Sequence, residues 1–220
     1  MKPVIHGQKG FTLLEIIVVL AVLGALSAML TPVVFRYIDD ANRTRAQGDT
    51  NTIAAAIQQM YKDTGRWPFY KVGTGPLTYA AATDAAILTS NHTGCSSAAP
   101  VAMSCDTTAP VTGTGWGSFS TSLVSSLTNQ LIANGITTAY STSGGRAWKG
   151  PYLDAIPALD PWGRSYVVNI ANADPNTEGS GQLWVIVASA GPDGNLDTTA
   201  STAGTANPAV GGDDVIARVK

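Results

Sequence analysis

The chain has 220 residues and a formal net charge of −2 at pH 7, which allows one medium-sized domain and an anchor. Charged residues make up only 13% of it, about half the usual share. The overall charge therefore predicts no nucleic-acid partner, and the isolated histidines, His6 and His92, leave no set of residues that would support an enzyme.

Residues 11–35 form the first predicted element, an apolar helix that can cross a membrane. Glu15 is the single charged residue in this stretch. A helix of this length spans about 37 Å, more than the ~30 Å hydrocarbon layer of a bilayer. The segment differs from an ordinary secretory signal peptide, because no small-residue cleavage site follows the apolar run. The small residue, Gly10, comes before it.

Glu15 is the anomaly of this helix, because a carboxylate near the bilayer core costs about 2–4 kcal/mol. Nothing else in the apolar run is expected to pair with it within one helix. Cleavage after Gly10 would create a free amine on Phe11, and the amine of a neighbouring chain would be a suitable partner. The alternative is a carboxylate that reaches the membrane interface alone. Pro32, which lacks an N–H, and Gly24 predict a place where the helix can bend.

The sequence Lys-Gly-Phe-Thr-Leu-Leu-Glu at residues 9–15 resembles the processing site of class III signal peptides. These belong to type IV pilins and to the pseudopilins of type II secretion. The resemblance implies that residues 1–10 are a leader, that a prepilin peptidase cuts after Gly10, and that it N-methylates Phe11. It also implies that Glu15 contacts the amino terminus of an adjacent subunit in a filament. Pro32 matches a proline of that family.

Residues 36–64 are predicted to continue the same helix as an amphipathic half. Apolar side chains recur there with the helical period of 3.6 residues, at Ile53, Ala56, Ile57, Met60 and Tyr61. Gly65 and Pro68 are expected to end the helix, after about fifty residues in all. This half should belong to a head domain that comprises residues 36–220 and should pack on the rest of that domain.

The middle of the head, residues 69–150, is polar and mostly irregular by its sequence. Residues 80–88 could form a short helix. Residues 118–134 carry leucines at helical spacing and predict a second amphipathic helix, which Gly135 would cap.

Two cysteines, Cys95 and Cys105, lie within this middle segment. In an exported domain they would form one disulfide that closes a loop, worth roughly 2–4 kcal/mol. The alternative is a pair of unrelated free thiols. Because positive residues flank both ends of the apolar helix, the charges do not decide its orientation. The disulfide would place the head in an oxidising compartment.

The last part of the chain, residues 151–220, predicts strands and an acidic loop. Residues 165–171 and 183–189 are β-branched and apolar, and residues 215–219 are a third short candidate. Helices first and strands last indicate an α+β head, with an antiparallel sheet packed on the long helix.

Several segments of the head resemble the major pseudopilin of type II secretion. They are residues 60–68, Met-Tyr-Lys-Asp-Thr-Gly-Arg-Trp-Pro, residues 160–163, Asp-Pro-Trp-Gly, and the loop residues 189–194 and 212–216. The resemblance implies a type IV pilin-like fold with a calcium-type loop. It covers residues 9–68 and 151–216, but it leaves out the middle segment.

Four aspartates gather in the C-terminal loop, with no lysine or arginine between the first and the last of them. Carboxylates without counter-charges repel one another, and Ca²⁺ relieves this with oxygen ligands. The resemblance implies that Asp193, Asp213 and Asp214 bind Ca²⁺ together with the backbone carbonyl of Ala190, with Asp197 as a further ligand. The alternative is a solvated acidic loop.

The resemblance implies a structural filament subunit and not an enzyme. It would be a major pseudopilin that prepilin peptidase processes and that polymerises into a periplasmic pseudopilus for type II protein secretion. The implied partners are further copies, minor pseudopilins, an inner-membrane assembly platform with its ATPase, and membrane lipid before assembly. No nucleic acid is expected.

The implied location is the inner membrane, with a single span and the head in the periplasm, followed by a periplasmic or cell-surface filament. Two alternatives stay open. One is a type IV pilin with a role in adhesion, motility or DNA uptake, which the long polar middle favours. The other is a minor tip subunit that binds a ligand through residues 70–150.

Overall fold

The computed structural model describes residues 10–65, 67–68, 87–90, 116, 126–135, 140–170, 185–199 and 210–219. The chain divides into two compact units, residues 1–41 and residues 42–220, which are treated separately below. The two cysteines lie outside the described residues.

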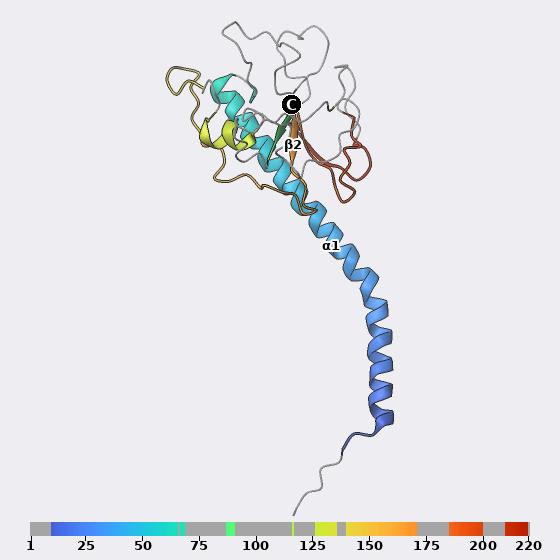
Figure 1. The fold of residues 1–220 in the computed structure, drawn as a ribbon. Helices are drawn as coiled ribbons and strands as arrows, with labels where there is room; N and C mark the ends of the chain where they lie inside the picture. The colour runs from blue at the N-terminus through green and yellow to red at the C-terminus, as the bar shows by residue number, and fades with distance from the viewer. Residues whose placement is uncertain are drawn as a thin grey trace, which may run out of the picture. The chain divides into compact units, whose positions relative to one another are not determined.

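The first element, helix α1, spans Leu13–Thr64 and contains 52 residues (Figure 1). It is continuous through Gly24 and Pro32, so the bend expected there stays a prediction. Gly65 follows in the left-handed region with φ +66°, and its N–H donates to the Tyr61 carbonyl at 2.7 Å. This is the glycine stop that the sequence predicts, and the helix ends where it was expected to end.

The first unit contains the apolar part of α1. Its large apolar side chains are exposed throughout, and none of its most apolar stretch of 18 residues is buried inside the protein. This stretch has a mean hydropathy of 2.6, so length and composition allow the helix to cross a membrane. An apolar helix that its own chain leaves uncovered needs lipid or other subunits around it.

The second unit is an α+β head with a four-stranded antiparallel sheet in the order β1-β2-β3-β4. The strands are β1 (Ile87–Thr89), β2 (Val167–Asn169), β3 (Ile186–Ser189) and β4 (Val215–Arg218). The last three lie inside the predicted segments and confirm them. The helix expected at residues 80–88 is wrong for its described end, because residues 87–88 belong to β1. There Leu88 pairs with Val168 across the sheet, and this pairing outweighs local preference.

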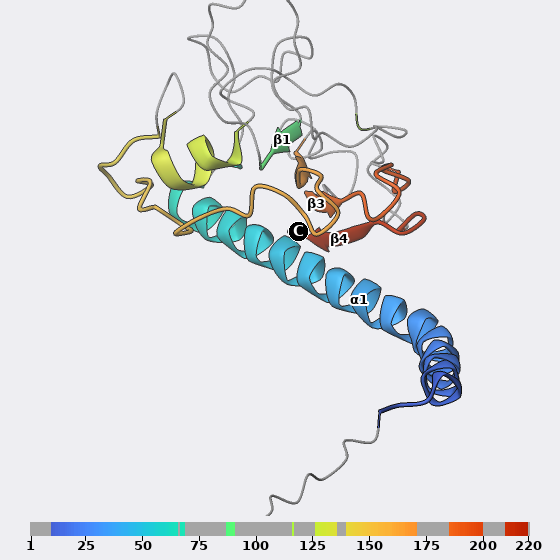
Figure 2. The same cartoon turned by 60° about the horizontal axis from the view of Figure 1, so that its bottom comes forward.

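Side chains alternate along each strand and so point to two opposite faces of the sheet, and both faces are buried. Leu88, Val168, Val187 and Ala217 occupy paired positions across the four strands, and they share one core with Ile53, Ile57 and Met60 of α1. Figure 2 shows this part of α1 running along the sheet beside β4. The expected packing of the sheet on the amphipathic half of the helix is confirmed.

Two details of this packing depart from the simple apolar stripe. Tyr61 is 37% exposed, and its ring stacks on Trp67 with centroids 4.2 Å apart. The edge strand β4 is tied to the helix by amide side chains: Gln47 donates to the carbonyl of Ile216 at 3.3 Å, and Gln58 donates to that of Val219. These bonds use carbonyls that an edge strand would otherwise expose.

The opposite face of the sheet carries a second, smaller core. Val167, Ala188 and Ile216 pack there around the ring of Trp116, with Ala190 and Leu196 completing the cluster. Trp116 belongs to the middle segment, and Leu196 belongs to the acidic loop. The middle segment therefore contributes directly to the core of the head.

Of the predicted second amphipathic helix, residues 118–134, the structure describes residues 126–134. Ser126 forms a β-bridge with Thr89, and the helix continues from Leu127 into a π-helical turn at Asn129–Ala133. Its leucines, Leu127 and Leu131, are buried as predicted. The cap differs from the prediction, because Asn134 and not Gly135 adopts the left-handed conformation, with φ 48°. Asparagine tolerates this conformation, and both ends of its amide bond the backbone of Tyr140, at 3.0 and 2.8 Å.

Candidate functional site

The predicted cleavage point lies directly before the start of α1. Gly10 and Phe11 are exposed, with Phe11 at 80%, and, apart from the chain neighbours of Gly10, no atom of the described residues lies within 4 Å of the place where a side chain on Gly10 would begin. The peptide bond between them is therefore accessible to a protease. Residues 1–9 of the expected leader lie outside the described part of the chain.

Glu15 forms a capping box with Thr12 at the first turn of α1. The Glu15 N–H donates to Thr12 Oγ1 at 3.2 Å, and the Thr12 N–H donates to Glu15 Oε2 at 3.5 Å. The Thr-x-x-Glu pattern at residues 12–15 signals this motif in the sequence, although the motif was not among the features predicted above. It corrects the expectation that no group of the same helix can pair with Glu15. The contact with an amine of another subunit stays a prediction.

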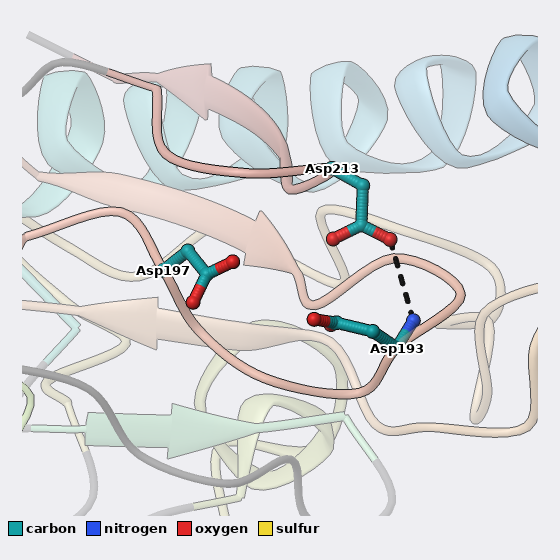
Figure 3. Close-up of side chains that lie close together, drawn as sticks. All are labelled: Asp193, Asp197 and Asp213. Atoms are coloured by element: carbon teal, nitrogen blue, oxygen red, sulfur yellow. Dashed lines mark hydrogen bonds between the residues drawn. The ribbon is translucent and has the colours of Figure 1, made fainter.

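Three carboxylates of the acidic loop converge after β3 and before β4. Each of Asp193, Asp197 and Asp213 offers an oxygen, and these oxygens all lie within 4.8 Å of one another. Figure 3 shows the three side chains turned toward a common space. The Asp193 N–H also donates to Asp213 Oδ2 at 3.3 Å, which ties the two arms of the loop together.

Asp193 is held in its charged form by its neighbour Asn195. The backbone N–H of Asn195 donates to Asp193 Oδ1 at 2.8 Å, and its side-chain amide donates to Oδ2 at 3.0 Å. These hydrogen bonds lower the pKa of the Asp193 carboxyl.

Asp214 lies next to the cluster and is more buried than its neighbours, and its role as a calcium ligand stays a prediction. It is 6% exposed, and its Oδ2 accepts the N–H of Thr198 at 2.6 Å, while Oδ1 has no hydrogen-bond partner among the described residues. Burial raises the pKa of this carboxyl, and the charges of Asp197 and Asp213 add to the rise. With Arg43 and Gln47 of α1, Asp214 also lines an open hollow of about 480 Å³.

Glycines allow the two arms of the loop to approach closely. Gly191 has φ +64°, and a Cβ on it would lie 2.6 Å from the Asp213 carbonyl oxygen. Gly212 has φ +51°, and a Cβ there would collide with the Asp197 carboxylate. Side chains at either position would push the carboxylates away from their present places.

The Asp-Pro-Trp-Gly segment supports the start of the loop. Asp160 is buried, and its Oδ1 accepts the N–H groups of Trp162 and Arg164 at 3.0 and 2.8 Å. Its Oδ2 accepts the hydroxyl of Ser189, the last residue of β3, at 2.6 Å. The turn also places the Arg164 guanidinium against Gly194, so a positive charge that is distant in the sequence comes close to the acidic loop.

The donor set fits a calcium ion. Calcium takes oxygen ligands at about 2.3–2.6 Å, so ligands on opposite sides of one ion lie at most about 5 Å apart, and the spacing of the three carboxylates satisfies this limit. The buried Asp214 Oδ1 has no hydrogen-bond donor in the described part of the chain, so its negative charge is left to a cation. No metal chemistry other than charge neutralisation and loop ordering is implied.

The structure thus brings together Asp193, Asp213 and Asp197, and it places Asp214 beside them in a hydrogen bond with the loop backbone. Ala190 is buried at the start of the loop. Sequence analysis did not identify Thr198 or Trp116, whose contacts depend on residues far apart in the chain and leave no local pattern.

Comparison with known proteins identifies the N-terminal segment. Residues 5–31 match the family model described as the prokaryotic N-terminal methylation motif. The match includes the expected cleavage point at Gly10, the capping-box residues Thr12 and Glu15, and most of the apolar helix. No solved structure matches the chain significantly.

The curated relatives are pilins and secretion proteins. The chain is 40% identical over 62 residues to "Toxin coregulated pilin" of Vibrio cholerae serotype O1, covering 28% of each chain. It is 42% identical over 66 residues to "Type II secretion system core protein G" of Pseudomonas aeruginosa, covering 30% of this chain and 46% of that protein. It is 35% identical over 68 residues to the protein of the same name from Pectobacterium carotovorum, covering 31% and 44%.

The chain therefore spans less than half the length of these three relatives. Their similarity, the long N-terminal helix and the small antiparallel sheet agree with a pilin-like α+β fold. The protein carries the prokaryotic N-terminal methylation motif, and about 30% of its length is similar to the toxin coregulated pilin and to the core protein G of type II secretion.

Proposed function

We propose that this protein is a filament subunit of the major pseudopilin type, processed by prepilin peptidase and assembled into a periplasmic pseudopilus for type II protein secretion. One observation carries the proposal: an accessible Gly10–Phe11 bond is followed directly by a capped apolar helix that its own chain leaves uncovered. In a filament, the corresponding helices of other copies would cover these apolar side chains and so bury their surface.

The head would lie in the periplasm and the apolar helix in the inner membrane until assembly. Export would be driven by partners, a membrane platform and its ATPase, because the protein's contribution is packing and not chemistry. The similarity to a toxin coregulated pilin keeps a type IV pilus as the second candidate. The Asp160 turn and the acidic loop favour the pseudopilin, because both match segments expected of the major pseudopilin.

The first prediction concerns processing. Protein purified from wild-type cells should begin with N-methylated Phe11, as intact-mass measurement and N-terminal sequencing would show. Gly10→Val should retain residues 1–10 and be absent from sheared filaments, because a side chain at this position would obstruct the cut. Gly24→Val is the matched control, since its Cβ also meets open space but lies far from the bond.

The proposal fails if wild-type filaments contain a subunit that keeps residues 1–10. Imaging of the same cells separates the two candidates. Short filaments that stay within the periplasm support the pseudopilus, whereas long surface fibres favour the pilus.

We also propose that Asp193, Asp197 and Asp213 bind a single Ca²⁺ ion that fixes the acidic loop. The second prediction is that full-length protein in detergent micelles melts about 5–10 °C higher with Ca²⁺ at a hundred times its Kd than with a chelator. Asp197→Asn should weaken binding measured by equilibrium dialysis.

Asp154→Asn controls for the loss of one carboxylate charge, because Asp154 is exposed and lies outside the loop. Equal calcium affinities for the Asp154 and Asp197 variants would rule out Asp197 as a ligand. An unchanged melting temperature in chelator would rule out the site.

A further inference from the structure

Trp116 connects the middle segment to the acidic loop. Its side chain is 1% exposed, and its Nε1–H donates to the backbone carbonyl of Thr198 at 2.6 Å. No similarity to the secretion proteins predicts this contact, because the resemblance in sequence leaves out residues 69–150. The contact joins segments that are 82 positions apart in the chain.

Thr198 is a second point, besides the bond between Asp193 and Asp213, at which the two arms of the loop meet. It is fully buried, and its backbone N–H donates to Asp214 Oδ2 at 2.6 Å. Its hydroxyl Oγ1 accepts the N–H of Gly211 at 3.0 Å, and its carbonyl accepts the Trp116 bond. Thr198 therefore uses its amide, hydroxyl and carbonyl at once: two of the bonds go to the arm at residues 211–214, and the third goes to Trp116.

The Trp116 ring also packs against the part of the loop that carries the carboxylates. Leu196, which is 1% exposed, shares the second core with Trp116 and Ala190. Leu196 immediately precedes Asp197, and Ala190 lies three positions before Asp193. Movement of the ring would thus shift the backbone that carries two of the three clustered carboxylates.

We propose that Trp116 is a positioning residue: through Thr198 and Leu196 it holds the acidic loop in the form that brings Asp193, Asp197 and Asp213 together. Through Trp116, the middle segment would therefore set the cation affinity of the loop. The dependence of affinity on Trp116 rests on the proposed calcium site, whereas the fixing of the loop does not.

A test compares Trp116→Phe with Trp148→Phe in the full-length protein in detergent micelles. Phenylalanine keeps a six-membered aromatic ring in the core but lacks the N–H, so the bond to Thr198 is lost and only a small cavity is left. Trp148 is the matched control, because its Nε1–H also donates to a backbone carbonyl, that of Gln130, at 3.3 Å, outside the second core. Hydrogen exchange by mass spectrometry is measured in chelator, and Ca²⁺ affinity by equilibrium dialysis.

We expect Trp116→Phe to speed amide exchange in residues 193–199 about tenfold and to weaken Ca²⁺ binding by a similar factor. Exchange in the buried part of α1, residues 53–60, should change much less, and Trp148→Phe should leave the loop as in wild type. Wild-type exchange in the loop of Trp116→Phe would overturn the proposal. So would equal acceleration in the loop and in α1, since that would make Trp116 an ordinary core residue.

The two proposals fail separately. If the wild-type protein binds no Ca²⁺, the cation site is rejected, and the exchange rates in chelator still decide whether Trp116 fixes the loop. If Ca²⁺ binds equally well to Trp116→Phe while the loop exchanges faster, the loop is fixed by Trp116 but the control of affinity is refuted.

Discussion

Gly191 stands where β3 leads into the acidic loop, and its backbone has φ +64°. Alanine there must accept a left-handed conformation and must also place a Cβ 2.6 Å from the Asp213 carbonyl oxygen. We predict that Gly191→Ala lowers the free energy of unfolding of the head by about 2–4 kcal/mol. Urea unfolding of the full-length protein, followed by tryptophan fluorescence, measures the change.

Gly163 provides the matched comparison. It has φ +85° in the Asp160 turn, but a Cβ on it meets no atom within 4 Å. Gly163→Ala should therefore lower the free energy of unfolding by only about 1–2 kcal/mol, the cost of holding alanine in a left-handed backbone conformation. Equal losses for the two variants would show that the close approach to Asp213 contributes nothing.

Local signals also explain which functional residues could be predicted. The aspartates of the loop stand out because no lysine or arginine lies among them. Their individual surroundings could not be predicted, because Asp214 is buried and accepts the N–H of Thr198, which a count of charges does not reveal. The capping box was predictable from Thr12 and Glu15 alone, since both of its bonds lie within one helical turn.

At the scale of elements, helix α1 was predictable over nearly its whole length. Its apolar run, its helical period and its glycine stop are all local in sequence. The strands β2 to β4 were found for a similar reason, as β-branched apolar runs bounded by turn residues. Each is shorter than its predicted segment, because pairing with its neighbours decides where a strand ends.

Strand β1 could not be predicted from local signals in the sequence. It has three residues and owes its place to pairing with β2, where Thr89 lies opposite Val167. The second core depends on similar long-range contacts, because Trp116 reaches it from a position outside every helix and strand predicted from the sequence. Such elements form only once the rest of the head is present, so their own sequence is a weak guide to them.

At the scale of the assembled molecule, Glu15 has two separable tasks. In the single chain its carboxylate caps α1, and in a filament it would neutralise the Phe11 amine of another copy. Glu15→Gln keeps an oxygen for the capping box but removes the charge, whereas Glu15→Ala removes both. Thr12→Ala removes the hydroxyl half of the cap and leaves the charge in place.

If charge pairing drives assembly, Glu15→Gln and Glu15→Ala should both be cut after Gly10 yet yield few sheared filaments, while Thr12→Ala assembles. The capping bond stabilises the helix by only about 0.5–2 kcal/mol. An unpaired carboxylate surrounded by lipid costs more free energy than this, so pairing it with an amine would favour assembly more strongly than capping does. Filaments are counted by electron microscopy, and the mature N-terminus of each variant is sequenced to separate assembly from processing. Wild-type filament numbers for Glu15→Gln would mean that capping, and not charge, is the task of this carboxylate in assembly.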